Sequence, residues 1–257
     1  MDTGPISIQV ERLSGVETRT ISIGSLAGAR FSSRDTATMR QELDEMLSQD
    51  GQYSGATKTN PSIFRIARYL LTQEETFEVQ GFLTGGEAEV VAIRCDDELF
   101  ISVGSDQCDR ELDPLFPDKP KQMCPHPMAT VAWPYAEVQD HWDQLQIYSE
   151  VTVGPHAIPL QDSPLSTLVN LDYLLAMHSV QTLANPMFLY CGSAEPLATA
   201  AQQAQALSLP ESIIHGTGDA FLARLHDPVL NRTIEHKFQA IPVGDDFAER
   251  CGRPVSN

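Results

Sequence analysis

The chain has 257 residues, and its 35 acidic and 17 basic residues give a formal net charge of −18. A surface this acidic repels phosphate backbones and anionic lipids, so nucleic acid and membranes are not expected partners. The sequence has no apolar run of about 18 residues or more, and it starts without the basic and apolar segments of a secretory signal. The five cysteines are widely spaced and form no Cys-x-x-Cys pair, which argues against a zinc finger or a disulfide framework. We therefore expect a soluble, cytoplasmic protein.

The first part of the chain predicts two strands followed by a helix. Residues 6–10 and 18–23 alternate apolar and polar side chains, which is typical of half-buried strands. Polar residues at 32–35 can cap a following helix, whose apolar stripe would consist of Met39, Leu43, Met46 and Leu47. A polar segment at 55–61 predicts a loop.

The rest of the chain predicts further strands and only a few helices. Strands are expected at 77–83, 90–95, 98–103, 188–191, 220–225 and 233–243. Helices are expected at 135–145, 168–180 and 197–209, and an irregular, proline-punctuated segment at 114–127. Many strands, few helices and no βαβ rhythm favour an α+β, β-rich fold, namely a mixed β-roll or barrel.

One hairpin carries the most informative pattern in the sequence. Its two strands, 90–95 and 98–103, flank Asp96-Asp97, which predicts a tight turn. A turn centred between these two aspartates sets Glu87 directly opposite Asp106 at the open end of the hairpin. A shift of one residue would place the two carboxylates on opposite faces, so the prediction depends on this register.

Three carboxylates would then converge at the open end of the hairpin. Glu89 lies two residues from Glu87 and therefore shares its face with Glu87 and Asp106. Like charges placed opposite each other destabilise a strand pair, which favours a bound cation between them. Oxygen ligands alone suit a hard divalent ion, namely magnesium, manganese or calcium. The alternative is a solvated acidic hairpin end, which is common in a chain this acidic.

Several segments resemble the fumarylacetoacetate hydrolase-like superfamily, in a branch catalogued as a domain of unknown function. The resemblance extends from about residue 24 to residue 243, and its motifs are the segments 84–89, 104–111, 121–125, 141–143 and 191–193. The first resembles the Glu-x-Glu metal motif of the superfamily, and the second resembles a run whose first aspartate binds metal. The combination is more specific than any one segment.

The resemblance implies a fold and a domain organisation. The fold would be the β-roll or barrel of the fumarylacetoacetate hydrolase C-terminal-domain type, with a few peripheral helices. The chain would form a single domain over 1–257, with N-terminal strands and a helix over about 1–60 and a catalytic roll over 61–257. Because such proteins are commonly dimers, a homodimer is a candidate assembly.

The resemblance also implies a metal centre and an activity. Glu87, Glu89 and Asp106 would hold a magnesium or manganese ion, and Lys121 would contact the substrate. Open positions on the ion would take the substrate's carboxylate and keto oxygen. The usual reactions are C–C hydrolysis of β-diketones, decarboxylation of β-keto acids, and isomerisation. All of them pass through an enolate-like charge, which a Lewis-acidic metal stabilises.

Two departures from the branch concern proton transfer. Counted from Arg34-Asp35, the positions of an expected histidine and glutamate fall on Glu42 and Glu45, which share one face of the predicted helix. These glutamates are candidate acid–base groups, and the alternative is an exposed acidic helix face. Gln107 stands where the branch has another histidine. Without these imidazoles, classical water-activated hydrolysis is less expected than in a typical member.

Several further residues have two interpretations. Arg34 could bind a substrate anion or pair with Asp35, and Lys121 could hold a substrate carboxylate or offset the acidic surface. Gly192 and Ser193 could present backbone N–H groups to an oxyanion, or the glycine could only form a turn. A structural pair with Glu111 is favoured for Arg110, and His126 is interpreted as a surface or core residue.

The residues and the resemblance together predict a metal-dependent enzyme for a small oxo-acid or β-dicarbonyl compound. The expected chemistry is that of a lyase, decarboxylase or isomerase with an enolate-like intermediate. C–C hydrolysis is the next most expected activity. The expected substrate-binding residues are Arg34, Gln107, Lys121, Gly192 and Ser193, and the catalytic candidates are Glu42, Glu45 and Lys121. One alternative is a cyclase or dehydratase of a biosynthetic pathway on the same fold. Another is a non-catalytic binding or scaffold protein.

Overall fold

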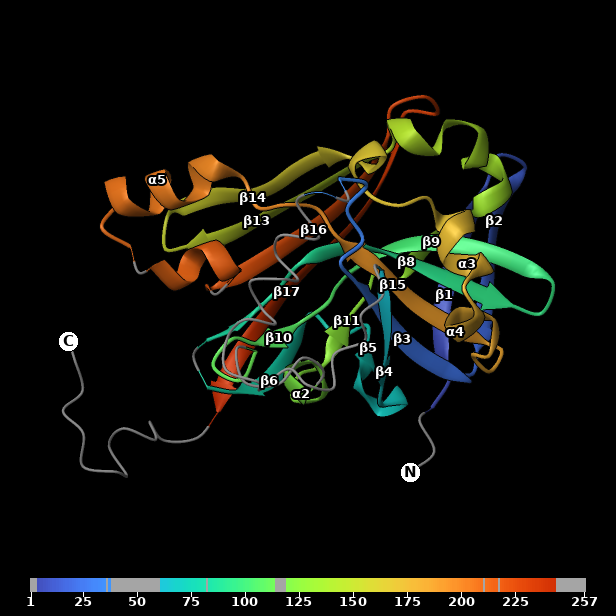
Figure 1. Ribbon diagram of the computed structural model, residues 1–257, viewed down its shortest axis with the longest axis horizontal. Helices are drawn as coiled ribbons and strands as arrows, with labels where there is room; N and C mark the ends of the chain where they lie inside the picture. The colour runs from blue at the N-terminus through green and yellow to red at the C-terminus, as the bar shows by residue number, and fades with distance from the viewer. Residues whose placement is uncertain are drawn as a thin grey trace.

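The computed structural model describes residues 4–35, 37, 61–81, 83–113, 119–209, 211–216 and 218–243. Within them the chain consists mainly of strands, which form two large sheets and two short strand pairs (Figure 1). This architecture confirms the β-rich α+β class. The helix expected after residue 35, with Glu42 and Glu45, lies outside the described residues, as does the loop expected at 55–61 apart from its last residue. The single-domain organisation stays a prediction.

The larger sheet has eight strands, of which β3, β8, β9 and β15 are buried on both faces. Its order is β2 (Gly15–Ile21), β1 (Ile6–Arg12), β12 (Val131–Pro134), β9 (Glu98–Ser105), β8 (Ala88–Cys95), β15 (Met187–Ser193), β3 (Ser25–Arg30) and β4 (Ser62–Ile66). Side chains alternate between two apolar clusters along a strand, so that Val91 and Ile93 belong to one and Val90 and Ala92 to the other. The first cluster consists mainly of residues of the larger sheet. The second includes residues of both sheets and of the peripheral helices α3 (Leu171–Ala176), α4 (His178–Gln181) and α5 (Ala198–Ala206).

The smaller sheet has five strands and packs on the outer face of the larger one. Its order is β14 (His156–Pro164), β13 (Gln146–Val153), β16 (Ala220–Asp227), β17 (Arg232–Val243) and β6 (Thr76–Gln80). Its inner residues Ile147, Phe221 and Leu225 share one core cluster with Val90 and Val103 of the larger sheet. The short strand pairs are β7 (Thr84–Gly85) with β10 (Cys108–Asp109), and β5 (Leu71–Thr72) with β11 (His126–Pro127).

The described helices are short and lie at the periphery (Figure 1). They are α2 (Lys119–Gln122), α3 (Leu171–Ala176), α4 (His178–Gln181), α5 (Ala198–Ala206) and the 3₁₀ helices η1 (Arg68–Leu70), η2 (Tyr135–Glu137), η3 (Gln139–Gln144), η4 (Leu165–Thr167) and η5 (Glu211–His215). None of the helices in the described part of the chain has the length and apolar character needed to cross a bilayer.

Two predicted helices differ from the observed elements. Segment 135–145 forms the 3₁₀ turns η2 and η3 in place of one α-helix, and His141 has non-helical backbone angles inside η3. Segment 168–180 divides into α3 and α4 because Met177 is extended, with φ −65° and ψ 134°. The strand expected at 77–83 ends at Gln80, because Gly81 takes a positive φ of 86°. In each case the backbone of one residue interrupts the expected element.

The sequence prediction missed the β13–β14 hairpin. Strand β13 alternates buried and partly buried residues, but β14 contains Pro159 and ends at Pro164, which argues against a strand in sequence terms. Because β14 is the outermost strand of its sheet, it can contain proline with one side of its backbone unpaired.

The register of the β8–β9 hairpin agrees with the prediction. Val90 pairs with Val103 and Ala88 pairs with Ser105, so the turn is centred on Asp96-Asp97. Asp96 adopts a positive φ of 54°, as a tight hairpin turn requires. Beyond the last pair, the backbone N–H of Asp106 donates a hydrogen bond to the carbonyl of Glu87 at 3.0 Å. Glu87 therefore lies opposite Asp106.

His236 on β17 should give the folded protein a pH-dependent stability. Its Nε2 is buried without a hydrogen-bond partner in the described structure, and burial lowers its pKa to about 4. Its pKa in an unfolded chain is about 6.5, so the unfolded state binds the proton more readily. Protonation then favours unfolding, and we expect this residue to remove about 2 kcal/mol of stability between pH 7 and pH 5.

Urea unfolding of the wild type and His236→Leu at both pH values measures this contribution. The variant should lose less stability than the wild type over the interval, because its leucine does not titrate. Equal losses in the two proteins would show that His236 does not contribute.

Candidate metal centre

Three carboxylates meet at the open end of the β8–β9 hairpin. Glu87 directly precedes β8, Glu89 is its second residue, and Asp106 directly follows β9. One oxygen from each side chain lies within 4.8 Å of the others. Glu89 and Asp106 are each only 2% exposed, whereas Glu87 is half-buried. The predicted register therefore brings these three side chains together.

A buried lysine and a partly buried arginine contact the carboxylate cluster. Lys121 of α2 places its Nζ 2.7 Å from Oδ2 of Asp106 and 3.6 Å from Oε2 of Glu87. Arg110 donates a hydrogen bond from its guanidinium group to Oε1 of Glu87 at 2.8 Å. This contact corrects the pairing of Arg110 with Glu111 that the sequence favoured. The cations partly compensate the charge that the three carboxylates concentrate here.

The environment separates the pKa values of the carboxyl groups. Burial and the nearby charge of Asp106 raise the pKa of Glu89 well above its ordinary value. Burial is also the largest single effect on Glu87 and Asp106, but nearby positive groups together outweigh it and hold each pKa below its ordinary value. These groups are Lys121 and Arg110 at Glu87, and Lys121 and His126 at Asp106. Burial opposes the charge of Lys121, but Asp106 and Glu87 raise its pKa. Glu89 is thus the carboxyl group that most readily holds a proton in the absence of a bound cation.

Strand β15 orients two of the carboxylates. Its pairing with β8 shifts register between Tyr190 and Ser193, and within this bulge Gly192 adopts a φ of 94°. The backbone N–H of Gly192 donates to Oε2 of Glu89 at 2.7 Å, and the Ser193 hydroxyl donates to Oε2 of Glu87 at 3.4 Å. Both predicted substrate-binding residues therefore adjoin the site, where they donate to the carboxylates.

His126 of β11 is a site residue that the sequence analysis interpreted as part of the surface or the core. It is fully buried, its Nε2 lies 2.7 Å from the carbonyl oxygen of Lys121, and its Nδ1 lies 3.2 Å from Oδ1 of Asp106. The second approach is not aligned as a hydrogen bond, so Oδ1 of Asp106 has no hydrogen-bond partner among the described residues. A sequence signal existed, because His126 directly follows the 121–125 segment of the resemblance.

A cavity of about 260 Å³ opens over the carboxylates. Arg30, the last residue of β3, lines it and pairs with Asp113 at 2.8 Å. Phe31 follows with a φ of 58°, a conformation that is rare for a non-glycine residue. Apart from Ala29 and Phe31 the described lining is polar, and it includes Ser32, Ser33, Glu87, Glu89, Asp106, Arg110, Asp113, Lys121, Ser193 and Glu195. The sequence analysis did not identify Arg30, although a charge ending an apolar strand was a visible signal.

Two of the predicted substrate-binding residues lie elsewhere. Arg34 pairs with Asp143, with Nη1 2.9 Å from Oδ2, instead of with Asp35, and it also donates to the carbonyl of Leu168. Gln107 lines a different cavity and is almost fully buried. The catalytic candidates Glu42 and Glu45 lie outside the described residues.

The donor set fits a hard divalent cation. All three side chains offer oxygen, which magnesium and manganese prefer. Oδ1 of Asp106 is a buried acceptor without a hydrogen bond in the described structure, so it is available as a ligand atom. Glu87, Glu89 and Asp106 are therefore the residues that could hold such an ion.

Comparison with solved structures identifies the fold of the chain. The fold resembles 2-hydroxyhepta-2,4-diene-1,7-dioate isomerase from Mycobacterium marinum, with a TM-score of 0.55, 9% identity and coverage of 94% of this chain and 100% of that chain. It also resembles fumarylpyruvate hydrolase from Pseudomonas aeruginosa, with a TM-score of 0.54, 14% identity, and coverage of 92% and 97%. A third similar structure is 2-keto-3-deoxy-D-arabinonate dehydratase, with a TM-score of 0.57, 10% identity, and coverage of 89% and 77%. The fold is that of the fumarylacetoacetate hydrolase superfamily, as the sequence resemblance implied.

The chain belongs to the family described as Protein of unknown function (DUF2848), whose sequence profile matches residues 29–238. This match spans the three carboxylates, both cations that contact them and the β15 bulge. It also agrees with the branch that the sequence motifs resemble. No curated protein matches the sequence.

Proposed function

We propose that this protein is a divalent-metal-dependent enzyme that acts on a small oxo-acid or β-dicarbonyl compound. The convergence of Glu87, Glu89 and Asp106 at a cavity that Arg30, Arg110 and Lys121 also line is the observation that carries this proposal. The similar fumarylpyruvate hydrolase was solved with Mn²⁺ and pyruvate, which is an oxo-acid. We infer the same class of cofactor and ligand for this chain.

Some residues of the cavity would hold the cofactor, and others would bind the substrate. Glu87, Glu89 and Asp106 would hold magnesium or manganese, which would supply Lewis-acid stabilisation of enolate-like charge. Lys121 and Arg110 would attract the substrate's carboxylate, and Arg30 would add a third positive charge at the wall. Binding the substrate between fixed cations would also orient its keto group towards the carboxylate cluster.

The lining of the cavity favours enolate chemistry over water-activated hydrolysis. No histidine lines it among the residues that the structure describes. We therefore propose a lyase, decarboxylase or isomerase first and a C–C hydrolase second, with Glu42 and Glu45 as candidate proton-transfer groups. A dehydratase is a further candidate, because it too can use an enolate-like intermediate and one of the similar structures is a keto-acid dehydratase. A homodimer remains a candidate assembly.

Calorimetric titration with Mn²⁺ tests the metal centre. Wild type should bind one ion per chain, and Glu89→Gln, which removes a ligand charge, should weaken binding by at least about a hundredfold. Glu78→Gln is the matched control, because Glu78 is an exposed carboxylate on β6. The control should bind Mn²⁺ as the wild type does. Failure of the wild type to bind at millimolar concentration would refute the proposed centre.

The activity is tested by adding β-keto acids, β-diketones and 3-deoxy-2-keto acids to the Mn²⁺-loaded protein. Turnover that Glu89→Gln abolishes and Glu78→Gln retains would support the enzyme. The product identifies decarboxylation, isomerisation, hydrolysis or dehydration. Metal binding without turnover of any of these compounds would favour the binding or scaffold alternative.

A further inference from the structure

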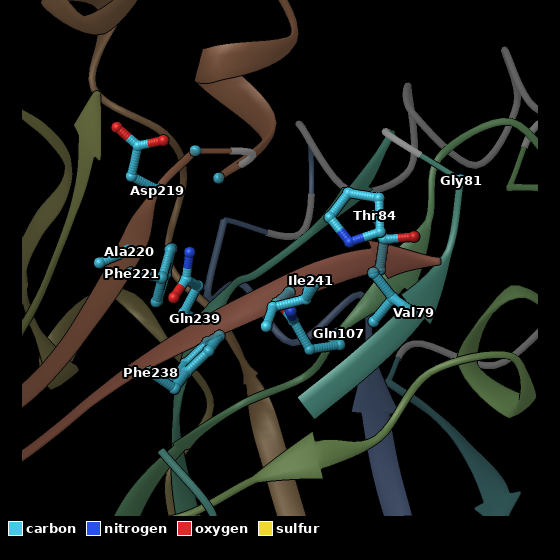
Figure 2. Close-up of a pocket in the computed structure, with 14 residues that line it drawn as sticks. Val79, Gly81, Thr84, Gln107, Asp219, Ala220, Phe221, Phe238, Gln239 and Ile241 are labelled. Carbon is cyan, nitrogen blue, oxygen red and sulfur yellow. The ribbon is translucent and has the colours of Figure 1, made fainter. Parts of the chain in front are cut away.

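The carboxylate cavity differs from a second cavity in the charges that line it. The second cavity, of about 320 Å³, lies between β6, the end of β17 and the segment leading into β16, and Gln107 lines it (Figure 2). Asp219 is the one formally charged residue of its described lining, so this cavity offers no cation to the carboxylate of an oxo-acid. An oxo-acid is therefore expected in the carboxylate cavity, where the lining charges decide which one fits.

The residues of the carboxylate cavity lie at different depths. Glu89, Asp106 and Lys121 are buried, and they would hold the ion and contact the oxo-acid group. Ser193 is partly exposed and Glu195 is exposed, so these two residues lie at the mouth of the cavity. The remainder of the substrate, beyond its oxo-acid group, would therefore lie against the mouth.

The formal charges of the cavity disfavour a second carboxylate on the substrate. The described lining has five carboxylates and three cationic side chains. Each cation already faces a carboxylate of this lining: Arg30 faces Asp113, Arg110 faces Glu87, and Lys121 faces Asp106. A bound divalent ion would bring the net charge of the lining only to zero, in a chain whose formal net charge is −18. A second substrate carboxylate would thus meet no uncompensated positive charge among the described residues.

Glu195 can distinguish a charged remainder from a hydroxylated one. Its carboxylate makes no hydrogen bond or ion pair with any described residue. An ionised carboxylate only accepts hydrogen bonds, so it can bind a hydroxyl group of the substrate, whereas it repels a second carboxylate. A cationic remainder is disfavoured in turn, because Arg30 and Arg110 line the same cavity.

We propose that the substrate of this site is an oxo-acid with a single carboxylate and an uncharged, hydroxylated remainder, and that Glu195 selects it. This inference rests on the proposed function and specifies the substrate class of the same cavity. Glu195 accepts a hydrogen bond from a hydroxyl group of the remainder, and its charge excludes oxo-acids that carry a second carboxylate.

Three oxo-acids with the same five-carbon chain test the selection. In 4-hydroxy-2-oxopentanoate the remainder has a hydroxyl group, in 2-oxopentanoate it is apolar, and in 2-oxoglutarate it ends in a carboxylate. Calorimetric titration of the Mn²⁺-loaded protein should show that the hydroxylated compound binds about fivefold more tightly than either of the others.

Two variants test the role of Glu195. Glu195→Gln removes the charge but keeps an acceptor, so it should strengthen 2-oxoglutarate binding about fivefold and leave 2-oxopentanoate unchanged. Glu195→Ala also removes the acceptor, and the hydroxylated compound should then bind no more tightly than 2-oxopentanoate. Glu78→Gln again serves as the control and should bind all three compounds as the wild type does.

The outcomes distinguish this inference from the proposed function. Failure of the Mn²⁺-loaded wild type to bind any of the three compounds at millimolar concentration would overturn both. If the compounds bind but 2-oxoglutarate or 2-oxopentanoate binds as tightly as the hydroxylated compound, the inference fails and the oxo-acid site stands. Unchanged affinity for 2-oxoglutarate in Glu195→Gln would likewise refute the role of Glu195 alone.

Discussion

Lys121→Met should lower the free energy of unfolding of the metal-free protein by about 3–5 kcal/mol. Lys121 is 3% exposed and pairs with Asp106, which is buried to the same degree. Removing the ammonium group leaves Asp106 and Glu87 as buried carboxylates with less compensating charge, next to Glu89. An uncompensated buried charge is among the most destabilising single changes in a protein.

Urea unfolding with and without Mn²⁺ measures this effect and its reversal. A bound divalent ion supplies the missing positive charge, and an ion at about 100 times its Kd adds about 2.7 kcal/mol to the folded state. The gain should be larger in Lys121→Met than in the wild type, because the ammonium group no longer repels the ion.

Lys119→Met is the control for this experiment. Lys119 lies on the same short helix but is exposed, so its replacement should change stability by no more than about 0.5 kcal/mol. If Lys121→Met were as stable as Lys119→Met, the pair with Asp106 would not stabilise the fold. If Mn²⁺ stabilised Lys121→Met no more than the wild type, the lysine and the ion would not compete.

Gly192→Ala should destabilise the protein by about 3 kcal/mol and weaken Mn²⁺ binding. Gly192 has a φ of 94°, which side-chain-bearing residues rarely adopt, and an added Cβ would overlap the hydroxyl group of Ser32. Relief of this overlap must move β15 or the segment after β3. Either movement displaces the N–H that holds Glu89 at 2.7 Å.

Gly154→Ala separates the cost of the positive φ from the cost of the overlap with Ser32. Gly154 also has a positive φ, of 55°, but its added Cβ would meet no atom within 4 Å. It should therefore cost only the backbone penalty of about 1–2 kcal/mol and leave the Mn²⁺ affinity unchanged. Thermal or urea unfolding of both variants measures the difference. Equal costs at the two glycines would show that the contact with Ser32 does not constrain the site.

The sequence was sufficient to predict the carboxylate cluster because its geometry is local. A turn at Asp96-Asp97 determines the pairing of β8 with β9, and the pairing determines that Glu87 faces Asp106. The alternation of side chains then adds Glu89. The same alternation could have predicted that Gln107 points away from Asp106.

The partners of the carboxylates were not predictable in this way. Arg30 comes from β3 and His126 from β11, and only the folded sheets bring them to the end of the β8–β9 hairpin. Arg34 was predicted to be a site residue, but it pairs with Asp143, which lies 109 positions further along the chain. Neither hydrophobic periodicity nor motif spacing contains information about such distant pairs.

The sequence by itself therefore determined the β-rich class, the hairpin register and the three converging carboxylates. These features depend on turn position and side-chain alternation over a few residues. Only the tertiary structure decided which cations neutralise the cluster, how the β15 bulge directs an N–H to Glu89, and that a second cavity lies behind Gln107. Those features result from the packing of elements distant in sequence, where shape and burial, and not local pattern, select the contacts.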